Sequence, residues 1–509
     1  MKRFTLVLML WAAIAALLSF NLNCYHFPNA ASPLEIPTYI EDSDETCHPD
    51  VLYFPEAWNG WHYWMSHTPY PNSNVQYENP SIVVSNDGIN WVEPEGISNP
   101  IADLYTGTDH NNNYNSDSHL VMSPDGQTMH LIWRRKNGWN NEIIRLKSST
   151  DGIAWSATTD ILSVLGTDAI LNETALSPCI VQTGDSSLPR YMLWTVNTKV
   201  NPRRIYLRTS QGITGNWSAP ILTDIEEFPE GYRLWHMDID FVDGYFEMIA
   251  SVGNPTAQEG KVLYLGKSLD GVHWEFSDAP VMLGAANSWD KRLYRSAFIR
   301  DESGQGYRLW YGSMDTPQWR IGYSESEVEG YLEAPLALDF YQSYNDGMNY
   351  FDLGWQRPNF EVIGYKVYHN HILVANLPAI ASTYSINSNA HAMYEYGAVF
   401  AVKAVYPTGD SDPVVRRSDI AIANPPNPPQ PGIEIKLYPN PFRQSFTLET
   451  KGISGGELKL YNLKGQLLHS QPYRKGDSIE IPSQLASGIY YLVLESPNAG
   501  KITKRVLKY

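Results

Sequence analysis

Cysteine, basic side chains and long apolar runs are all scarce in this sequence. Only three of its 509 residues are cysteines, Cys24, Cys47 and Cys179, so it has no disulfide framework and no cysteine-based metal motif, although a Cys47–Cys179 disulfide stays open. Lysine and arginine number 37 against 55 aspartate and glutamate residues, which gives a net charge of −18. This balance argues against nucleic acid or an anionic membrane as a partner, because both require a basic face.

The one long apolar run lies at the N-terminus. It follows Met1-Lys2-Arg3 and extends from Phe4 to about Phe20, which is the layout of a signal peptide. We assign residues 1–24 to this peptide without a defined cleavage site; a membrane anchor is the alternative, although the run is short for one. We expect no transmembrane segment in the mature chain, and export through the periplasm to the outer-membrane surface or beyond.

Aromatic residues and glycine-containing turns are abundant instead. Aromatic side chains make up 13% of the chain, and a Ser-x-Asp-Gly-x-x-Trp turn occurs at Ser85–Trp91, Ser149–Trp155 and Ser268–Trp274, with a looser copy at Ser210–Trp217. Short strands repeating at roughly 60 residues indicate a β-propeller. Five apolar first strands predict five blades within residues 45–335, and the Asp-Gly turns are interpreted as structural.

The rest of the chain is also predicted to be all-β. Residues 336–423 contain Tyr365-Lys366-Val367-Tyr368 and an alternating strand from Phe400 to Tyr406, which predicts a small β-sandwich. These strands resemble those of a fibronectin type III domain, whose role here would be that of a spacer. Residues 424–432 are rich in proline and form a stiff linker.

The C-terminal module, residues 433–509, carries three signals in order. It begins near Tyr438-Pro439-Asn440-Pro441, contains Gly488-Ile489-Tyr490-Tyr491 and ends with the basic pair Lys504-Arg505. The module resembles the C-terminal sorting domain of the type IX secretion system, a small β-sandwich. The resemblance implies passage across the outer membrane by that machinery, followed by removal of the module and either release or surface attachment.

Candidate site residues, catalytic or substrate-binding, lie at the entries to the five first strands, which converge on the propeller axis. They are ionisable or aromatic and comprise His48, Asp50, Asp117, His119, Glu173, Trp235, His236, Asp238, Tyr294 and Arg295. Crowding and burial raise carboxylate pKa values, as general acid–base chemistry requires. Two carboxylates across a cleft are the usual equipment of a glycosidase.

With these entries the chain resembles the five-bladed propeller glycoside hydrolases, the group that includes family 43. The resemblance implies that Asp50 is the base or nucleophile, that Asp117 tunes the acid and that Glu173 is the acid. Asp238 is the alternative acid, because it aligns with Asp50 in its strand. No cofactor is required, although the resemblance allows a structural calcium ion in the propeller channel, and residue spacing shows no metal cluster.

A poly- or oligosaccharide is the expected substrate. Glu78 and Arg134, from connections between second and third strands, join the entry residues as expected substrate contacts: His48, His119, Trp235, His236, Tyr294 and Arg295. Arginine is suited to holding a carboxylate or hydroxyl groups. Two alternatives stay open: a non-catalytic carbohydrate-binding propeller, and a polysaccharide lyase, which Arg295 beside Tyr294 would serve.

Overall fold

The computed structural model describes residues 18–418, apart from 166–172, 186, 226–227, 229–230, 254–260, 316–317, 346–347, 370–371 and 388–397. Beyond 418 it describes 434–438, 445–451, 453, 455–461, 467–474, 478–480, 488–496 and 500–508. The apolar run before residue 18 and the predicted linker lie outside these residues. The chain divides into two compact units, one of residues 1–339, 357–381 and 393–419 and the other of the remainder.

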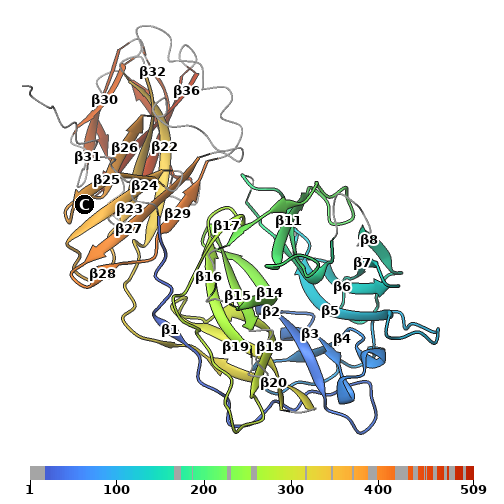
Figure 1. The fold of residues 1–509 in the computed structure, drawn as a ribbon. Helices are drawn as coiled ribbons and strands as arrows, with labels where there is room; N and C mark the ends of the chain where they lie inside the picture. The colour runs from blue at the N-terminus through green and yellow to red at the C-terminus, as the bar shows by residue number, and fades with distance from the viewer. Residues whose placement is uncertain are drawn as a thin grey trace, which may run out of the picture. The chain divides into compact units, whose positions relative to one another are not determined.

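Five sheets, antiparallel except for one strand, make up most of the first unit, and they follow the predicted repeats (Figure 1). We call them blades one to five. Blade one is β2 (Thr46–Trp58), β3 (Trp61–Pro69) and β4 (Ser81–Ser85); blade two is β5 (Asn113–Met122), β6 (Met129–Asn137), β7 (Asn141–Ser149) and β8 (Thr159–Leu165); blade three is β9 (Leu176–Gln182), β10 (Tyr191–Asn197), β11 (Arg204–Ser210) and β12 (Ile221–Leu222); blade four is β14 (Arg233–Val242), β15 (Tyr245–Gly253), β16 (Val262–Ser268), β17 (His273–Phe276) and the parallel strand β13 (Asp224–Ile225); blade five is β18 (Arg292–Arg300), β19 (Tyr307–Asp315) and β20 (Gln318–Glu325).

The first strands of the five sheets form a closed ring. β2 contacts β5, β5 contacts β9, β9 contacts β14, β14 contacts β18, and β18 returns to β2. Each blade buries apolar residues against the next; one such cluster joins Trp194 of blade three to Phe246 and Trp274 of blade four. Sheets around a common axis are the arrangement of a β-propeller, so all first-strand entries meet at one end of that axis.

The Asp-Gly turns lock neighbouring blades together. Their glycines, Gly88, Gly152 and Gly271, have φ angles of +75°, +76° and +73°. A Cβ atom on them would lie 2.9, 2.1 and 2.6 Å from the tryptophan rings of the preceding blades, which are Trp310, Trp64 and Trp194. Only glycine satisfies both the left-handed backbone and this close approach. The structural interpretation of these turns is therefore confirmed.

A further sheet and an N-terminal segment complete the first unit. The sheet contains β24 (Gly364–His369), β25 (Ile372–Pro378), β27 (Val399–Tyr406), β28 (Gly409–Asp410) and β29 (Val414–Arg417). Lys267 of blade four donates to Asp412 beside this sheet at 2.7 Å, and both are buried. Leu18 and Leu22, which the sequence places in the signal peptide, are buried in the same unit. β1 (Tyr25–His26) pairs with β21 (Glu327–Val328).

The second unit is also all-β. It contains β22 (Ala337–Asn345), β23 (Met348–Gln356) and β26 (Thr383–Asn387), and C-terminally β30 (Glu434–Tyr438), β31 (Ser445–Lys451), β32 (Gly455–Tyr461), β33 (Leu467–Arg474), β34 (Ser478–Glu480), β35 (Gly488–Ser496) and β36 (Gly500–Lys508). The predicted fibronectin-like segment is thus divided between the two units, and its assignment stays a prediction.

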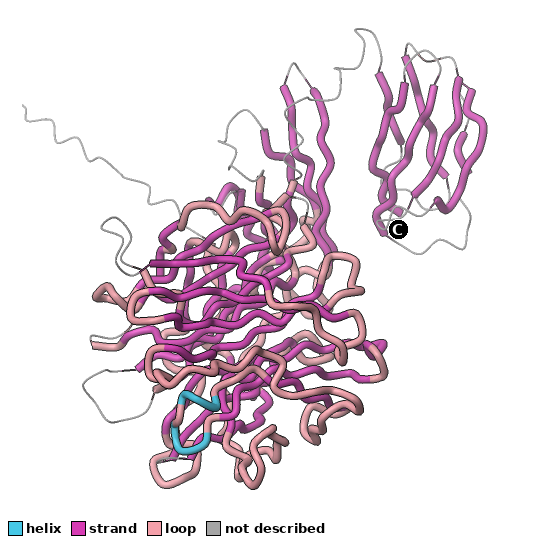
Figure 2. The backbone as a smooth tube through the Cα atoms, turned by 90° about the vertical axis from the view of Figure 1, so that its right-hand side faces the viewer, coloured by secondary structure: helices cyan, strands magenta, loops and turns pink. Residues whose placement is uncertain are grey.

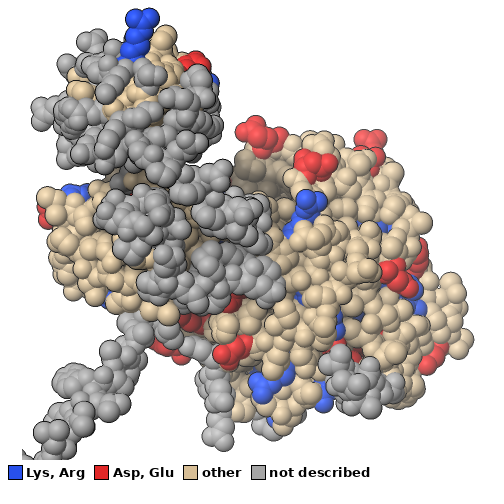
Figure 3. Space-filling model, turned by 90° about the horizontal axis from the view of Figure 1, so that it is seen from above, with Lys and Arg blue, Asp and Glu red and all other residues tan. Residues whose placement is uncertain are grey.

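Helix is nearly absent from the described residues, as Figure 2 shows. The exceptions are two single 3₁₀ turns, η1 (Pro71–Ser73) and η2 (Val75–Tyr77). In the described part of the chain, therefore, no helix has the length and apolarity to cross a bilayer. Figure 3 shows lysine and arginine side chains interspersed with aspartate and glutamate over the described residues of one face.

Candidate metal centre at the propeller axis

The first strands begin with β-bulges, which turn extra side chains toward the axis. The register shifts between Cys47 and Asp50 in β2, and between Ser116 and His119 in β5. The bulged residues His48 and Asp117 have φ angles of +54° and +51°. Left-handed backbone at non-glycine residues costs free energy and clusters at functional sites. A similar shift in β14 frees Trp235, just before His236, from the regular register.

Three buried side chains from three blades converge at these bulges. Asp117 Oδ1 lies 3.4 Å from His48 Nε2 and 3.3 Å from His236 Nδ1, and each residue is at most 2% exposed. Among the residues that the structure describes, none of these three atoms has a hydrogen-bond partner. Buried polar atoms are normally satisfied, so three ligand-type atoms that face one another without hydrogen bonds mark a candidate ligand site. We call this group the entry cluster.

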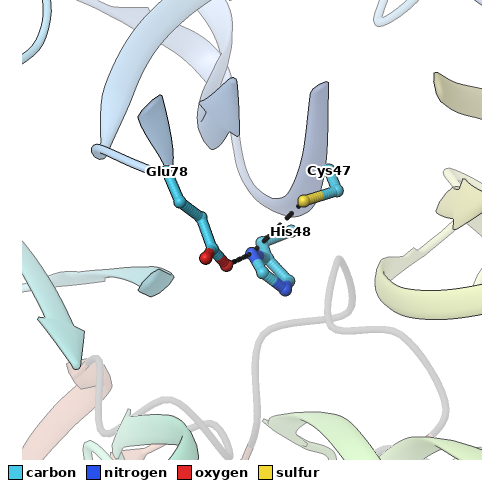
Figure 4. A group of neighbouring side chains, drawn as sticks. All are labelled: Cys47, His48 and Glu78. Carbon is cyan, nitrogen blue, oxygen red and sulfur yellow. Dashed lines mark hydrogen bonds and ion pairs between the residues drawn. The ribbon is translucent and has the colours of Figure 1, made fainter. Parts of the chain in front are cut away.

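Side chains behind His48 fix its orientation. Its Nδ1 atom lies 2.8 Å from Thr68 Oγ1 and 3.2 Å from Glu78 Oε1. Figure 4 shows the ring extending from its turn with Glu78 and Cys47 on the Nδ1 side. These contacts leave Nε2 directed at Asp117. Holding the second imidazole nitrogen in this way is the usual arrangement around a metal-ligating histidine.

The charges of the entry cluster suit a cation. Burial lowers the pKa of His48 to about 4 and that of His236 well below its usual value, so both imidazoles are neutral at neutral pH. Burial by itself would raise the pKa of Asp117, but His48, Arg134 and Arg295 lower it, and the net shift is downward. Two neutral imidazoles and one carboxylate are ligands suited to a divalent transition metal.

A second group, which we call the channel cluster, lies farther along the first strands. Asp50 accepts a hydrogen bond from Leu120 N at 2.6 Å, and its other oxygen lies 2.5 Å from His119 Nδ1. His119 Nε2 contacts Ile180 O at 2.8 Å. Asp238 accepts from Phe298 N at 3.3 Å and lies 3.7 Å from the same His119 Nδ1. Unlike the entry cluster, these groups largely satisfy one another.

Electrostatics explain the protonation of the channel cluster. Burial, then repulsion from Asp50, raises the pKa of Asp238 to about 8. Burial would lower the pKa of His119, but the Asp50 carboxylate outweighs it and raises that pKa well above its usual range. Asp50, His119 and Asp238 line a cavity of about 370 Å³ that continues along the first strands to Asp240 and Arg300. The entry-cluster residues do not line this cavity.

The other predicted site residues take varied positions. Glu173 is not brought into either cluster, because Arg208 binds both of its oxygens at 2.8 and 2.6 Å. Arg134 forms two hydrogen bonds with Glu142 and lies 3.5 Å from Asp117 Oδ2. Arg295 is fully buried, 3.9 Å from Asp50 Oδ1.

Trp235 and Tyr294 border the entry cluster. The Trp235 Nε1 atom donates to Tyr294 Oη at 3.2 Å. The Tyr294 ring lies edge-on to His236, with ring centroids 4.4 Å apart, and 5.3 Å from the His48 ring. The two aromatic residues thus stand beside the two histidines of the entry cluster.

Residue spacing in the sequence did not show that His48, Asp117 and His236 come together as a group that could hold a metal ion. A group of metal-ligating atoms within 4.8 Å of one another is present. Arg203 and Lys261 were not among the candidate residues either. They lie in the connections between the second and third strands of blades three and four, and their side chains contact Trp235. Cys47 and Cys179 are both buried and free, so the Cys47–Cys179 disulfide that the sequence allowed is not formed.

Comparison with known proteins separates the two ends of the chain. Residues 436–509 match the family model of the secretion system C-terminal sorting domain. The A type blood N-acetyl-alpha-D-galactosamine deacetylase of Flavonifractor plautii is 30% identical over 368 residues, which cover 57% of this chain and 46% of that protein. The chain therefore spans about half the length of this relative.

Solved structures give the same likeness. A crystal structure of an N-acetylgalactosamine deacetylase from F. plautii with blood group B trisaccharide has a TM-score of 0.51 and 28% identity, and covers 59% of this chain and 95% of that one. A thermostable family-43 glycoside hydrolase has a TM-score of 0.41 and 12% identity, with 62% and 93% covered. The chain thus carries a C-terminal sorting domain, which marks it for export to the cell surface or beyond, and the first part of the chain is similar in sequence and fold to an N-acetylgalactosamine deacetylase.

Proposed function

We propose that this protein is a secreted, metal-dependent deacetylase that removes the acetyl group from an N-acetylated amino sugar in a glycan. The observation that carries the proposal is the convergence of His48 Nε2, Asp117 Oδ1 and His236 Nδ1, all buried and without hydrogen bonds. The likeness to a deacetylase of N-acetyl-galactosamine supports the reaction class.

The spacing of the three ligand atoms fits a metal. Ligands about 2.1 Å from a tetrahedral zinc ion are separated by about 3.4 Å from one another. The two distances from Asp117 Oδ1 are 3.4 and 3.3 Å. Three protein ligands leave a further coordination position open, which is the pattern of catalytic rather than structural sites.

Amide hydrolysis needs a polarised carbonyl and an activated water, and a divalent ion at this site would supply both. The residues of the chain do the rest. Thr68 and Glu78 hold the His48 ring with Nε2 forward, and Arg134 keeps the Asp117 carboxylate ionised. Trp235 and Tyr294 border the cluster, where they can pack against the sugar and exclude water.

Release of acetate from a panel of N-acetylhexosaminides tests the proposal. The metal-loaded enzyme should release acetate, and chelation should abolish the release until a divalent ion is restored. His48→Ala should lose activity, whereas His130→Gln should retain it, because His130 contacts Ser148 on blade two and belongs to neither cluster. Acetate release that survives both chelation and His48→Ala would contradict the proposal.

A glycoside hydrolase is the second candidate, and the channel cluster favours it. Asp50 and Asp238 approach the same His119 Nδ1 atom and line one cavity. With a pKa raised to about 8, Asp238 would be a protonated acid at neutral pH, and Asp50 would be the base or nucleophile. Reducing ends released by the wild type and lost in Asp50→Asn would support this reading; equal release by both would exclude it.

The proposed architecture has five propeller blades and a spacer before the sorting domain. The five sheets and the closed ring of first strands support a propeller of five blades. The strands of residues 337–417 support a fibronectin type III-like spacer between the propeller and the sorting domain. Such a spacer and the type IX secretion route would suit an enzyme acting on large glycans outside the cell.

A further inference from the structure

Two cations flank the aromatic residues that border the entry cluster. The Lys261 Nζ atom lies 3.9 Å from the Tyr294 ring centroid and 4.6 Å from that of Trp235. The Arg203 guanidinium carbon lies 3.8 Å from the Trp235 centroid. Both cations are half-buried. They come from different blades, since Arg203 directly precedes β11 and Lys261 directly precedes β16.

Neither cation is neutralised by the residues that the structure describes. No carboxylate among them lies within ion-pairing distance of Lys261 or Arg203, and the Arg203 Nη1 atom donates a hydrogen bond to the backbone oxygen of Leu234 at 3.2 Å. Burial, then the charge of Arg203, holds the pKa of Lys261 well below its usual range. Two partly desolvated cations that repel each other gain free energy when an anion binds between them.

The nearest buried carboxylate does not serve as that anion. Asp117 attracts Lys261 electrostatically, but its Oδ2 atom lies 3.5 Å from Arg134 Nη1 and its Oδ1 atom faces His48 and His236. A metal ion at the entry cluster would use that remaining oxygen. The charge of Lys261 and Arg203 would then face an incoming substrate uncompensated.

We infer that Lys261 and Arg203 form a subsite for an anionic substituent, a carboxylate or a sulfate ester, on the substrate near its acetamido group. This inference rests on the proposed function, because the entry cluster determines where the acetamido group lies. A guanidinium offers paired donors to an oxyanion, and an ammonium adds a point charge. The preferred glycan would therefore be an acidic one. Charge-assisted hydrogen bonds contribute enough for a preference of about tenfold to a hundredfold.

Matched oligosaccharides provide the test. One pair joins N-acetylhexosamine to a hexuronic acid or to the corresponding neutral hexose; the other carries or lacks a sulfate ester. Initial rates of acetate release by metal-loaded enzyme give kcat/KM for each member. Lys261→Gln and Arg203→Gln are compared with Arg190→Gln, which removes the same charge from an exposed position just before β10.

The expected result is a preference of about tenfold or more for the charged member of at least one pair, mainly through a lower KM. Which pair shows it identifies the anion as carboxylate or sulfate. The preference should fall to below about threefold in Lys261→Gln and Arg203→Gln, and persist in Arg190→Gln. Equal kcat/KM values within both pairs would overturn the inference, as would a preference that survives both substitutions.

A binding measurement separates this inference from the deacetylase proposal. Calorimetry with the same oligosaccharides needs no turnover. If no acetate is released, the proposed function fails; tighter binding of the charged member that is lost in Lys261→Gln would still support the subsite. Acetate release without any charge preference, in rates and in binding, would instead refute the subsite and leave the deacetylase proposal standing.

Discussion

The entry cluster and the channel cluster have similar composition but opposite hydrogen bonding. Each combines buried histidine with buried carboxylate on the first strands of the propeller. In the channel cluster both Asp50 oxygens and both His119 nitrogens have hydrogen-bond partners. In the entry cluster three converging atoms have none. Burial and ionisable character therefore do not distinguish the two clusters; what distinguishes the entry cluster is that three ligand-type atoms without hydrogen bonds face one another.

Among the changes considered, the loss of an entry-cluster side chain should reduce activity the most. His236→Ala takes away one of the three proposed metal ligands, and we expect at least about a thousandfold loss of acetate-releasing activity. Circular dichroism should show retained β-structure, because both nitrogens of His236 lack hydrogen-bond partners. Activity within tenfold of the wild type would break the proposed distinction between the clusters.

Asp50→Asn should damage stability rather than activity. It leaves a buried His119 without its carboxylate, and breaking such a pair costs about 3 kcal/mol or more of the free energy of unfolding. Urea denaturation followed by tryptophan fluorescence measures the loss. Asp125→Asn, in an exposed turn of blade two, is the control and should leave the midpoint nearly unchanged. A stable but inactive Asp50→Asn would favour the glycoside hydrolase reading.

A smaller effect is expected from a change to Thr68, which contacts the Nδ1 atom of His48 and should influence metal affinity. Thr68→Val keeps the side-chain shape and removes the Oγ1 contact to His48 Nδ1. Loss of such support typically lowers metal affinity by about tenfold to a hundredfold. Competition with a chromogenic chelator measures the affinity. Thr195→Val, at a buried threonine whose hydroxyl has no hydrogen-bond partner, should not change it; an equal change in both variants would show that the Thr68 contact is immaterial.

The smallest effect concerns Asp240, which lines the channel cavity. Burial raises the pKa of Asp240 to about 6, so the folded chain binds this proton more tightly than the unfolded chain, and ionisation above pH 6 opposes folding. The pKa difference of about two units corresponds to at most about 3 kcal/mol. Because Asp240 is partly exposed, we expect Asp240→Asn to stabilise the protein by a smaller amount, about 1 kcal/mol, at pH 7 to 8. The gain should disappear near pH 4 and below. Denaturation midpoints across this range check it, and a gain that is independent of pH would contradict it.

Most of the fold could be predicted from local sequence, whereas the site could be predicted only in part. The Asp-Gly turns carry their own hydrogen bonds: Asp87 Oδ1 accepts from Ile89 N and Asn90 N. Because this chemistry is local, the repeat can be read from the sequence. The entry alignment also found His48, Asp117 and His236, since all five entries must converge on one axis.

The sequence did not indicate that these three residues form one group, because the grouping depends on contacts between distant segments. The bulges that give His48 and Asp117 positive φ angles have no signature in the sequence. Nor does residue spacing reveal that Asp117 Oδ1 meets nitrogens from two other blades. Glu173 was named by its position, but its pairing with Arg208 depends on a neighbouring strand. Hydrogen-bond satisfaction is a property of the folded chain alone.

Metal content measured after exposure to equimolar zinc and gel filtration tests the central claim most directly. The entry cluster should hold about one ion per chain in the wild type. Asp50→Asn should keep that ion, because the channel cluster does not supply the ligands, and His236→Ala should lose it. The account would be contradicted by a wild type that retains no ion, or by an ion that is lost in Asp50→Asn and kept in His236→Ala.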